Sequence, residues 1–437
     1  MQKVDLIIYN AAQLVTCASN NKPKRGDAML DVGLIENGAI AVNEQKIVGV
    51  GASSEISSNF QANKTIDAGG KTVTPGFVDC HTHVVFAGNR LNEFELKIKG
   101  ADYLEILENG GGIISTVEKT RNADLSELVE QSWKRLDAML ACGTTTAEVK
   151  TGYGLSLPAE MKMLDAISEL DQTHVLDLVP TFLAAHAIPP EYKEEVQSSK
   201  FKVQSRSDDY VDLICKEMLP VAADWYKDLH FSVKRVPFFA DVFCERNAFN
   251  LEQTRRVLET AKSLGFLLKA HVDEFTNLGG ARLAVELGAT SIDHLDATND
   301  EEIKMLAQSE TIAIVTPTVN FNFGSNEFAN ARKLIDSGCA LAVSTDYNPG
   351  SAPCASLPLA MAIACRYQKL LPSEAMNAAT INAAFGVGLG DKIGSLETGK
   401  LADILILDTN DYRQIAYEFG ANFVETVIKN GEIVFEK

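Results

Sequence analysis

The chain has 437 residues, of which 46% are hydrophobic and 23% charged, and its formal net charge is −19 at pH 7. This composition is typical of a globular protein, and the length predicts one large domain with a smaller one beside it. The acidic balance argues against nucleic acid and membrane surfaces as partners, because both attract basic proteins. No apolar run approaches the roughly 18 residues of a membrane span, and residues 1–10 lack a signal-peptide core, so we expect a cytoplasmic protein.

Short strand-like runs separated by turns occupy both ends of the chain. They cover residues 4–10, 38–51 and 64–70 near the N-terminus and residues 399–408 and 423–437 near the C-terminus. Segments this short cannot each bury a face alone, so we expect the two ends to pair. The prediction is a small composite β-sandwich domain made of residues 1–70 and 395–437.

The middle of the chain, residues 71–394, alternates short apolar runs with segments of helical period. The expected strands are residues 77–84, 144–150, 174–187, 238–245, 266–275, 289–295, 312–319 and 341–348. Helical segments such as 125–143 and 251–265 separate them, and each of these two ends on a glycine. Eight alternations predict an α/β fold of the (β/α)8 TIM-barrel type. An open doubly wound sheet is the alternative, but no G-x-G-x-x-G motif follows a first strand.

Eight cysteines are scattered without a C-x-x-C pair, which favours reduced thiols over a disulfide framework. The histidines are distributed quite differently. Five of the seven lie at the C-terminal ends of expected strands, and Asp346 ends the last strand. In a barrel of this kind these ends carry the active site, so the sequence predicts a functional cluster there.

The motif "DCHTH" places His81 and His83 one residue apart, and residues two apart on a strand share a face at roughly 6.5–7 Å. Their imidazoles can converge on one ion with bonds of about 2.1 Å, although two unrelated core histidines would give the same pattern. With His271 and Asp346 they form a set of three imidazoles and one carboxylate. Such a set suits zinc or iron, and a metal of this kind lowers the pKa of bound water to about 7.

Two further residues are candidates for acid–base chemistry. His294, beside Asp293, is expected to handle protons or stabilise an oxyanion, although a local ion pair is the simpler interpretation. Glu274, three residues after His271, is expected to be the second carboxylate of the site rather than a solvated loop acid. Which of Glu274 and Asp346 is the general base stays open, because paired acids beside a metal exchange roles easily.

The stretch "PGFVDCHTHVVFAG" with His271, His294 and Asp346 resembles the amidohydrolase superfamily over essentially the whole chain. The resemblance implies a metal-dependent hydrolase, and the lack of a bridging lysine on the fourth strand implies one metal per subunit, zinc or iron in a divalent or trivalent state. By the same resemblance His81, His83, His271 and Asp346 hold the metal, Glu274, His294 and Asp346 are catalytic, and the protein is a homodimer.

Six segments, including "FAGNR", "EVKTGYGLSL", "FLAAHAIPPEY" and "STDYNPGSAP", resemble the imidazolone-hydrolysing branch of that superfamily. This implies a small anionic substrate, imidazolone propanoate, whose cyclic amide is opened to N-formimidoyl-L-glutamate. The implied substrate contacts are Arg90, Tyr153, His186, Glu274, Asn348, Gly350 and Ser351. A guanidinium suits a propanoate tail, because it binds carboxylates bidentately.

Two other functions compete with this one. A deaminase acting on a nitrogen heterocycle would use the same metal set, but a neutral base does not need an arginine for a carboxylate. A barrel that serves only as a scaffold would lack some of the ligands, and all four are present. Residues 221–243 look long and aromatic for the superfamily, so we interpret segment 221–240 as a surface insertion.

Overall fold

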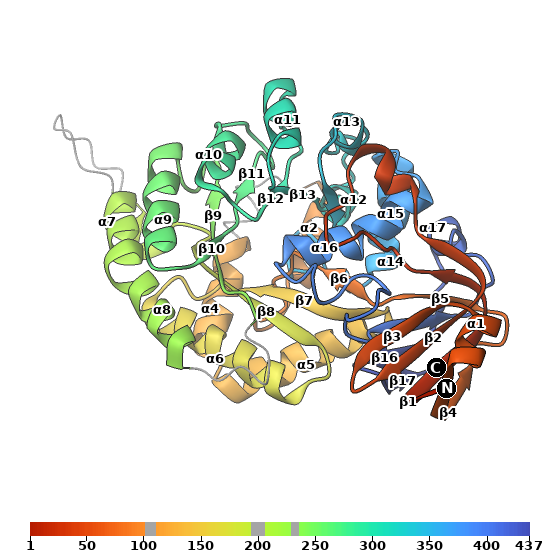
Figure 1. The fold of residues 1–437 in the computed structure, drawn as a ribbon. Coiled ribbons are helices and arrows are strands. Elements are labelled where there is room, and N and C mark those ends of the chain that lie inside the picture. Colours follow the sequence, from red (N-terminus) through yellow and green to blue (C-terminus); the bar gives the residue numbers. More distant parts are fainter. Residues whose placement is uncertain (101–110, 194–205, 229–235) are drawn as a thin grey trace, which may run out of the picture.

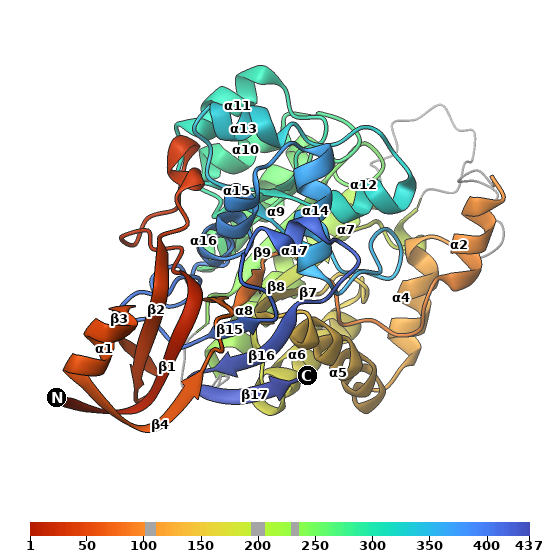
Figure 2. The same ribbon diagram turned by 90° about the vertical axis from the view of Figure 1, so that its right-hand side faces the viewer.

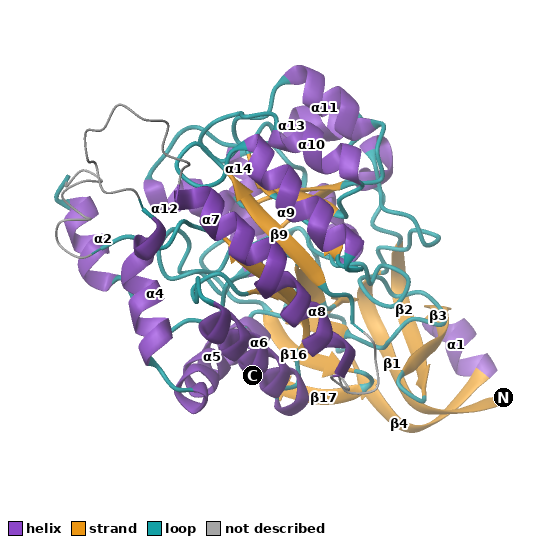
Figure 3. Cartoon of the chain, turned by 90° about the vertical axis from the view of Figure 1, so that its left-hand side faces the viewer, coloured by secondary structure: helices purple, strands orange, loops and turns teal. Residues whose placement is uncertain are grey.

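Two separate sheets organise the chain in the computed structural model, which describes residues 1–100, 111–193, 206–228 and 236–437 (Figure 1). One sheet contains strands from both ends of the chain (Figures 1 and 2). The other is a barrel of parallel strands, with helices around it (Figure 3). The predicted fold class, a (β/α)8 barrel with a small composite β-sandwich domain formed by both termini, is confirmed in the barrel and in the separate terminal strands, which belong to one connected sheet.

The terminal sheet has the order β17-β16-β15-β5-β1-β2-β3, and β4 pairs with the first half of β1 on the same edge that β5 occupies further along. Its strands are β1 (Gln2–Val15), β2 (Leu34–Asn43), β3 (Lys46–Ala52), β4 (Phe60–Asp67), β5 (Thr72–Pro75), β15 (Ile404–Leu407), β16 (Val424–Lys429) and β17 (Glu432–Glu436). Antiparallel pairing of β5 with β15 joins the two ends of the chain. Helix α1 (Ser53–Asn59) follows β3. The domain boundaries at residues 70 and 395 stay predictions.

The barrel sheet has the order β14-β13-β12-β11-β9-β8-β7-β6, and all its pairs are parallel. Its strands are β6 (Phe77–Asp79), β7 (Thr144–Lys150), β8 (Asp177–Ala185), β9 (Phe239–Cys244), β10 (Leu267–Leu268), β11 (His271–Val272), β12 (Ser291–His294), β13 (Ile312–Val315) and β14 (Leu341–Val343). β10 and β11 share the fifth position, because both pair with β9. Every strand expected from the sequence is therefore present, although several are shorter than expected.

Helices surround the barrel (Figure 3). They are α2 (Leu91–Ile98), α4 (Ile113–Asn122), α5 (Leu125–Ala141), α6 (Leu157–Thr173), α7 (Arg206–Leu213), α8 (Leu219–Asp228), α9 (Leu251–Ser263), α10 (Gly280–Leu287), α11 (Asp300–Ala307), α12 (Pro317–Phe323), α13 (Ala331–Asp336), α14 (Leu357–Tyr367), α15 (Pro372–Ala378), α16 (Ile381–Gly386) and α17 (Gln414–Tyr417). Single-turn segments are η1 (Gly26–Leu30), η2 (Pro190–Tyr192) and the π-helical η3 (Ile214–Met218). Among the described ranges no helix is long and apolar enough to cross a membrane.

The interpretation of segment 221–240 as a surface insertion is wrong for its described part. Residues up to Asp228 belong to helix α8, and Phe239 begins β9, so both ends of the segment are barrel elements; residues 229–235 lie outside the described residues. The aromatic residues have a packing role, since the rings of Trp225 and Tyr226 lie 5.7 and 4.9 Å from that of Phe238. The expected free thiols are present, because all eight cysteines are unpaired.

Side chains rather than a strand ladder join the first and last barrel strands. The bridge between Thr82 and Tyr347 is the only β-bridge between these two segments in the described chain, with the His83 amide donating to the Tyr347 carbonyl at 2.9 Å. Below it, the buried carboxylate of Asp79 accepts hydrogen bonds from the Ser344 hydroxyl and from the Thr345 amide (3.1 Å) and hydroxyl (2.6 Å). Asp79 thus fixes the end of β14 beside the end of β6.

Candidate metal centre and active site

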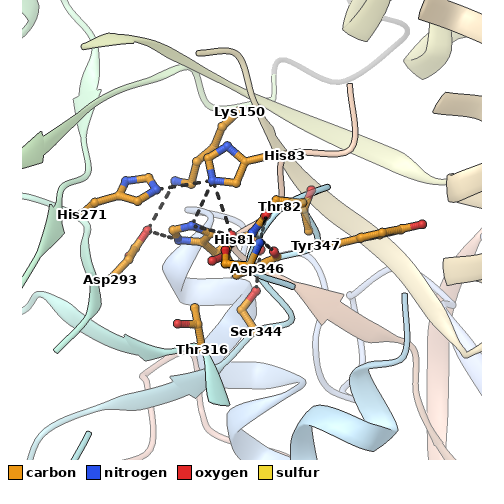
Figure 4. Close-up of polar contacts among 12 residues, drawn as sticks. His81, Thr82, His83, Lys150, His271, Asp293, Thr316, Ser344, Asp346 and Tyr347 are labelled. Atoms are coloured by element: carbon orange, nitrogen blue, oxygen red, sulfur yellow. Dashed lines mark hydrogen bonds and ion pairs between the residues drawn. The ribbon is translucent and has the colours of Figure 1, made fainter. Parts of the chain in front are cut away.

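The histidines and Asp346 meet at the C-terminal ends of the barrel strands, as Figure 4 shows. His81 and His83 lie just beyond β6, which ends at Asp79 rather than continuing to residue 84 as expected. His271 begins β11, and Asp346 follows β14. All four residues are buried, at 0–3% exposure. Three strand ends therefore deliver the predicted ligand set to one place.

Four of the distances between candidate ligand atoms are nearly equal. His83 Nε2 is 3.3 Å from His81 Nε2 and 3.4 Å from His271 Nε2, and Asp346 Oδ1 is 3.5 Å from the Nε2 atoms of both His81 and His83. Bonds of about 2.1 Å in a tetrahedral site give ligand atoms about 3.4 Å apart. The observed spacings match that edge length.

The protonation of these side chains also fits a cation. Burial lowers the pKa of His81, His83 and His271 well below the usual histidine value, so the imidazoles are neutral and their lone pairs are available. Asp346 Oδ1 is buried and accepts no hydrogen bond within the described chain, and burial raises the pKa of this carboxyl. An adjacent cation would supply the charge that keeps Asp346 ionised.

A layer of buried charges that we did not single out from the sequence lies against this cluster. Asp293 Oδ2 is 2.7 Å from His81 Nδ1, and Asp241 Oδ2 is 3.0 Å from His271 Nδ1. Lys150 contacts both aspartates, and although burial favours its neutral form, their charges and that of Glu148 raise the pKa of Lys150. The sequence did carry a signal, since these charges interrupt runs that are otherwise those of buried strands.

His294 lies at the end of β12 with its ring in the same cluster, 5.2 Å from the His81 ring between centroids. Its Nδ1 is 3.1 Å from the Thr316 hydroxyl and its Nε2 is 4.0 Å from Glu274 Oε2. Burial lowers the pKa of His294 to about 4, whereas burial and the charge of Asp346 raise the pKa of Glu274 well above its usual value. His294 and Asp346 have φ angles of 83° and 49°, a strained backbone of the kind found at functional sites.

A cavity of about 490 Å³ opens onto this cluster. It is lined by all the predicted substrate and catalytic residues and by every predicted metal ligand except His81, which lies beneath. Residues not anticipated from the sequence complete the wall, among them Lys97, Phe243, Glu245, Arg246, Phe275 and Phe323.

Arg90 is held on the cavity wall by Glu93. The guanidinium donates from Nε at 2.7 Å and from Nη2 at 2.5 Å to the two oxygens of Glu93, which also accepts from the Gly112 amide and pairs with Lys97. Burial opposes ionisation of Glu93, but these donors outweigh it and lower its pKa to about 2. Three of the five guanidinium hydrogens remain for another acceptor.

Tyr153 and His186 form the wall beside His83. The His186 ring stacks on the His83 ring at 5.0 Å, and its Nδ1 lies 3.1 Å from the Gly152 carbonyl, which can only accept, so Nδ1 carries the hydrogen and Nε2 is the acceptor. The Tyr153 loop is shaped by Glu160, whose carboxylate accepts from the amides of Gly152, Gly154 and Leu155 at 2.7–3.0 Å. The glycines on either side of Tyr153 thus serve this close approach.

The loop after β14 brings Asn348, Gly350 and Ser351 to the cavity. Both Asn348 Nδ2 hydrogens are used, on the Asp346 carbonyl and the Ser351 hydroxyl, and its Oδ1 accepts from the amides of Gly350 and Ser351, all at 2.8 Å. Asn348 therefore organises the loop that follows a metal-ligand candidate. Gly350 packs flat on Arg90, since a Cβ there would lie 2.0 Å from Arg90 Nη1.

The chain is a parallel barrel, and the ends of its strands bring neutral imidazoles and a carboxylate to distances suited to metal coordination. These features are those of metal-dependent barrel enzymes. The Amidohydrolase family matches residues 72–434 of the chain. Imidazolonepropionases from Chloroflexus aggregans and Alkaliphilus oremlandii are 51% and 48% identical to it, each over 99% of both chains. The chain therefore belongs to the amidohydrolase family, and within it to the imidazolonepropionases.

Solved structures with a similar fold include an adenosine deaminase from Xanthomonas campestris, with a TM-score of 0.71, 20% identity, and coverage of 99% of this chain and 93% of that one. The guanine deaminase of E. coli has a TM-score of 0.70 and 17% identity, with 99% of both chains covered. At these identities the likeness shows the shared fold alone. Membership of the amidohydrolase family implies a divalent metal, for which the histidine and aspartate groups above are the candidate ligands.

Proposed function

We propose that this protein hydrolyses the cyclic amide of 4-imidazolone-5-propanoate to N-formimidoyl-L-glutamate. The observation that carries the proposal is a single cavity with a candidate metal cluster on its floor and a fixed arginine on its wall. A heterocycle with an acidic tail requires both features: the metal cluster for the ring and the arginine for the carboxylate. Relatives named imidazolonepropionase, similar over their full lengths, support the choice of substrate.

We assign the metal to His81, His83, His271 and Asp346, with zinc and iron as the candidates, because borderline nitrogen ligands with one carboxylate suit both. When bound there, the metal supplies activation of water near neutral pH and polarisation of a carbonyl group. The ring carbonyl then faces the floor of the cavity, where His294 and Glu274 lie within 4.0 Å of each other.

The reaction adds one water molecule across the ring amide bond. Asp346 or Glu274 takes a proton from the attacking water as its oxygen bonds to the ring carbonyl carbon. His294 stabilises the oxyanion: if the Thr316 hydroxyl donates to its Nδ1, the ring hydrogen lies on Nε2 and points into the cavity. The bond from carbon to ring nitrogen then breaks, the nitrogen receives the proton held by the carboxylate, and the carbonyl becomes the new carboxylate of the product.

The propanoate tail is assigned to Arg90, whose free guanidinium edge offers two parallel hydrogen bonds. Tyr153 and His186 contact the ring from the side of His83, with the His186 Nε2 accepting from a ring N–H. The Gly350 and Ser351 backbone lines the opposite wall, in the shape that Asn348 imposes. The homodimer expected from the sequence stays a prediction.

The direct test is loss of the ultraviolet absorbance of imidazolone propanoate on addition of the metal-loaded protein. Glu274→Gln should lower kcat by about 10²–10⁴-fold, because a positioned acid–base group contributes that much, while metal content stays at the wild-type level. Wild-type rates in this variant would remove Glu274 from the mechanism. Release of ammonia from adenosine or guanine without turnover of imidazolone propanoate would contradict the proposed function and favour a deaminase.

A further inference from the structure

Five charged side chains with 0% exposure form a layer against the candidate metal cluster, and the proposed mechanism uses none of them: Glu148, Lys150, Asp241, Lys269 and Asp293. They come from four positions of the barrel sheet: β7, β9, the position that β10 and β11 share, and β12. Removing so many charges from water is costly, and such a layer often adds little to stability over an apolar core. Its retention in this barrel calls for a role other than packing.

Lys150 is the centre of the layer. Its Nζ lies 2.7 Å from Asp241 Oδ2, 3.3 Å from Asp293 Oδ2 and 2.8 Å from Glu148 Oε1, and Figure 4 shows it reaching toward the histidine cluster. Asp241, Asp293 and His271 are close enough together to suggest a second metal site. The Lys150 ammonium group already lies between the two aspartates, so it takes the place that a second metal ion would occupy.

The same two carboxylate oxygens that contact Lys150 also contact the histidines. Asp293 Oδ2 lies 2.7 Å from His81 Nδ1, and Asp241 Oδ2 lies 3.0 Å from His271 Nδ1. The second oxygens are anchored as well, since Asp293 Oδ1 accepts from the Ser291 hydroxyl at 2.8 Å and Asp241 Oδ1 from the His271 amide at 3.1 Å. An ionised carboxylate can only accept, so His81 Nδ1 carries its hydrogen and His81 Nε2 presents a lone pair. The contact between His271 Nδ1 and Asp241 is an ion-pair distance without hydrogen-bond geometry, so it limits the ring direction of His271 but does not define its tautomer.

We propose that Lys150 is a positioning residue that clamps Asp241 and Asp293 and thereby fixes the tautomer of His81 and the ring directions of His81 and His271. One lysine thus orients two ligands that come from different strands, β11 and the segment after β6. The inference rests on the proposed metal ligation by these histidines and extends it to the residues behind them. Carboxylates in this position affect metal affinity by about 10–100-fold.

Lys150→Met removes the clamp while keeping the length of the side chain. The matched control is Lys429→Met, because Lys429, at the end of β16, is also a buried lysine that bridges two aspartates. They are Asp403 and Asp177, the first residue of β8, each at 2.6 Å. The measurements are the zinc dissociation constant from competition with a chromophoric chelator and the imidazole ¹⁵N shifts of the metal-free protein labelled at its seven histidines. We expect zinc affinity to fall about 10–100-fold in Lys150→Met, with an altered tautomer at His81, and to change less than threefold in Lys429→Met.

Wild-type zinc affinity and tautomers in Lys150→Met would overturn the proposal, as would an equal loss of affinity in Lys429→Met. Should Lys150→Met fail to fold, Asp241→Asn and Asp293→Asn carry the same test, because each removes a charge that contacts Lys150. The amide of Asp293→Asn can also turn its NH₂ toward His81 Nδ1 and reverse the tautomer. Unchanged affinity in both variants then contradicts the clamp. If the wild-type protein binds no zinc in this assay, both the proposed metal ligation and the clamp are contradicted. If it binds zinc but does not turn over imidazolone propanoate, only the proposed substrate is contradicted.

Discussion

Glu93 governs how Arg90 can meet an anionic ligand. It holds the Nε and Nη2 edge of the guanidinium, while Gly350 lies against Nη1, so the side chain is fixed before any ligand arrives. A group held in this way loses little conformational entropy on binding. The same rigidity makes the site selective for a planar acceptor placed at the remaining edge.

Arg90→Lys should therefore raise KM for imidazolone propanoate by roughly tenfold or more, because an ammonium cannot reproduce the planar fork. The value of kcat should change much less, since the tail is bound equally in the ground and transition states. Steady-state kinetics of the two proteins check this. An analogue with a neutral propanamide tail is the control. If Arg90→Lys raises KM for this analogue as much as for imidazolone propanoate, Arg90 does not bind the carboxylate.

The depressed pKa of Glu93 makes a prediction about acid stability. Its pKa is about 2 in the folded protein and near 4.5 when unperturbed, so its stabilising effect is complete above pH 5 and is lost as the pH falls toward 2. The contribution at neutral pH is at most about 3 kcal/mol. Urea unfolding of metal-free wild type and Glu93→Gln should therefore differ at pH 7 and converge toward pH 3. A difference that is constant over this range would assign the effect to packing.

Individual residues also show where the sequence is informative about the site. The histidines were found because they stand at strand ends, and their ligand atoms do converge. Lys150, Asp241 and Asp293 were missed because only the ends of the expected strands were searched for functional residues, and charges within the strands were not considered. The fully bonded amide of Asn348 could not be foreseen either, since it depends on how the following loop turns back on itself.

At the scale of elements, hydrophobic period and glycine stops predicted the barrel well. The expected helix at residues 125–143 is α5, whose N-terminus is capped by the Asp124 carboxylate on the Glu127 amide at 2.8 Å. Strand ends were predicted too long, as in β6 and β14, because the active-site segments beyond them are buried like strands while their backbone turns away from the ladder. Pairing partners far apart in sequence, such as β5 with β15, were inferred only from the shared character of the two ends.

The link between β5 of the terminal sheet and β6 of the barrel is a single residue long. Only Gly76 separates them, and its amide donates to the Asp403 carbonyl at 2.9 Å. A Cβ at this position would lie 2.3 Å from the Thr145 hydroxyl and 2.5 Å from its methyl group, both buried on β7. Any adjustment there moves the strand that leads directly to His81 and His83.

Gly76→Ala should for this reason destabilise the protein by about 1–3 kcal/mol, the usual cost of an overpacked core, and should also weaken metal binding. Urea unfolding and chelator competition measure the two effects. Gly420→Ala is the control, because a Cβ at Gly420 meets no atom within 4 Å. If Gly76→Ala behaves like this control, the junction is not the constraint that the contacts indicate.

On the scale of the whole molecule, the candidate ligands lie on both sides of the seam where the barrel sheet closes with few backbone hydrogen bonds, between β6 and β14. His81 and His83 lie on one side of the seam between β6 and β14 and Asp346 lies on the other, with a single bridge between these segments in the described chain. The terminal sheet is continuous with the same strand through Gly76 and closes on β15. A cation at this seam would therefore stabilise both sheets together.

Removing the metal should accordingly lower the temperature of the whole unfolding transition rather than of one part of it. A ligand present at about a thousand times its dissociation constant stabilises the native state by about 4 kcal/mol, which predicts a shift of several degrees in a calorimetric scan. Asp346→Ala should show a much smaller shift on addition of zinc, because one ligand and the link across the seam are lost. A scan in which one transition moves with zinc while another stays in place would show that the terminal sheet unfolds independently of the barrel.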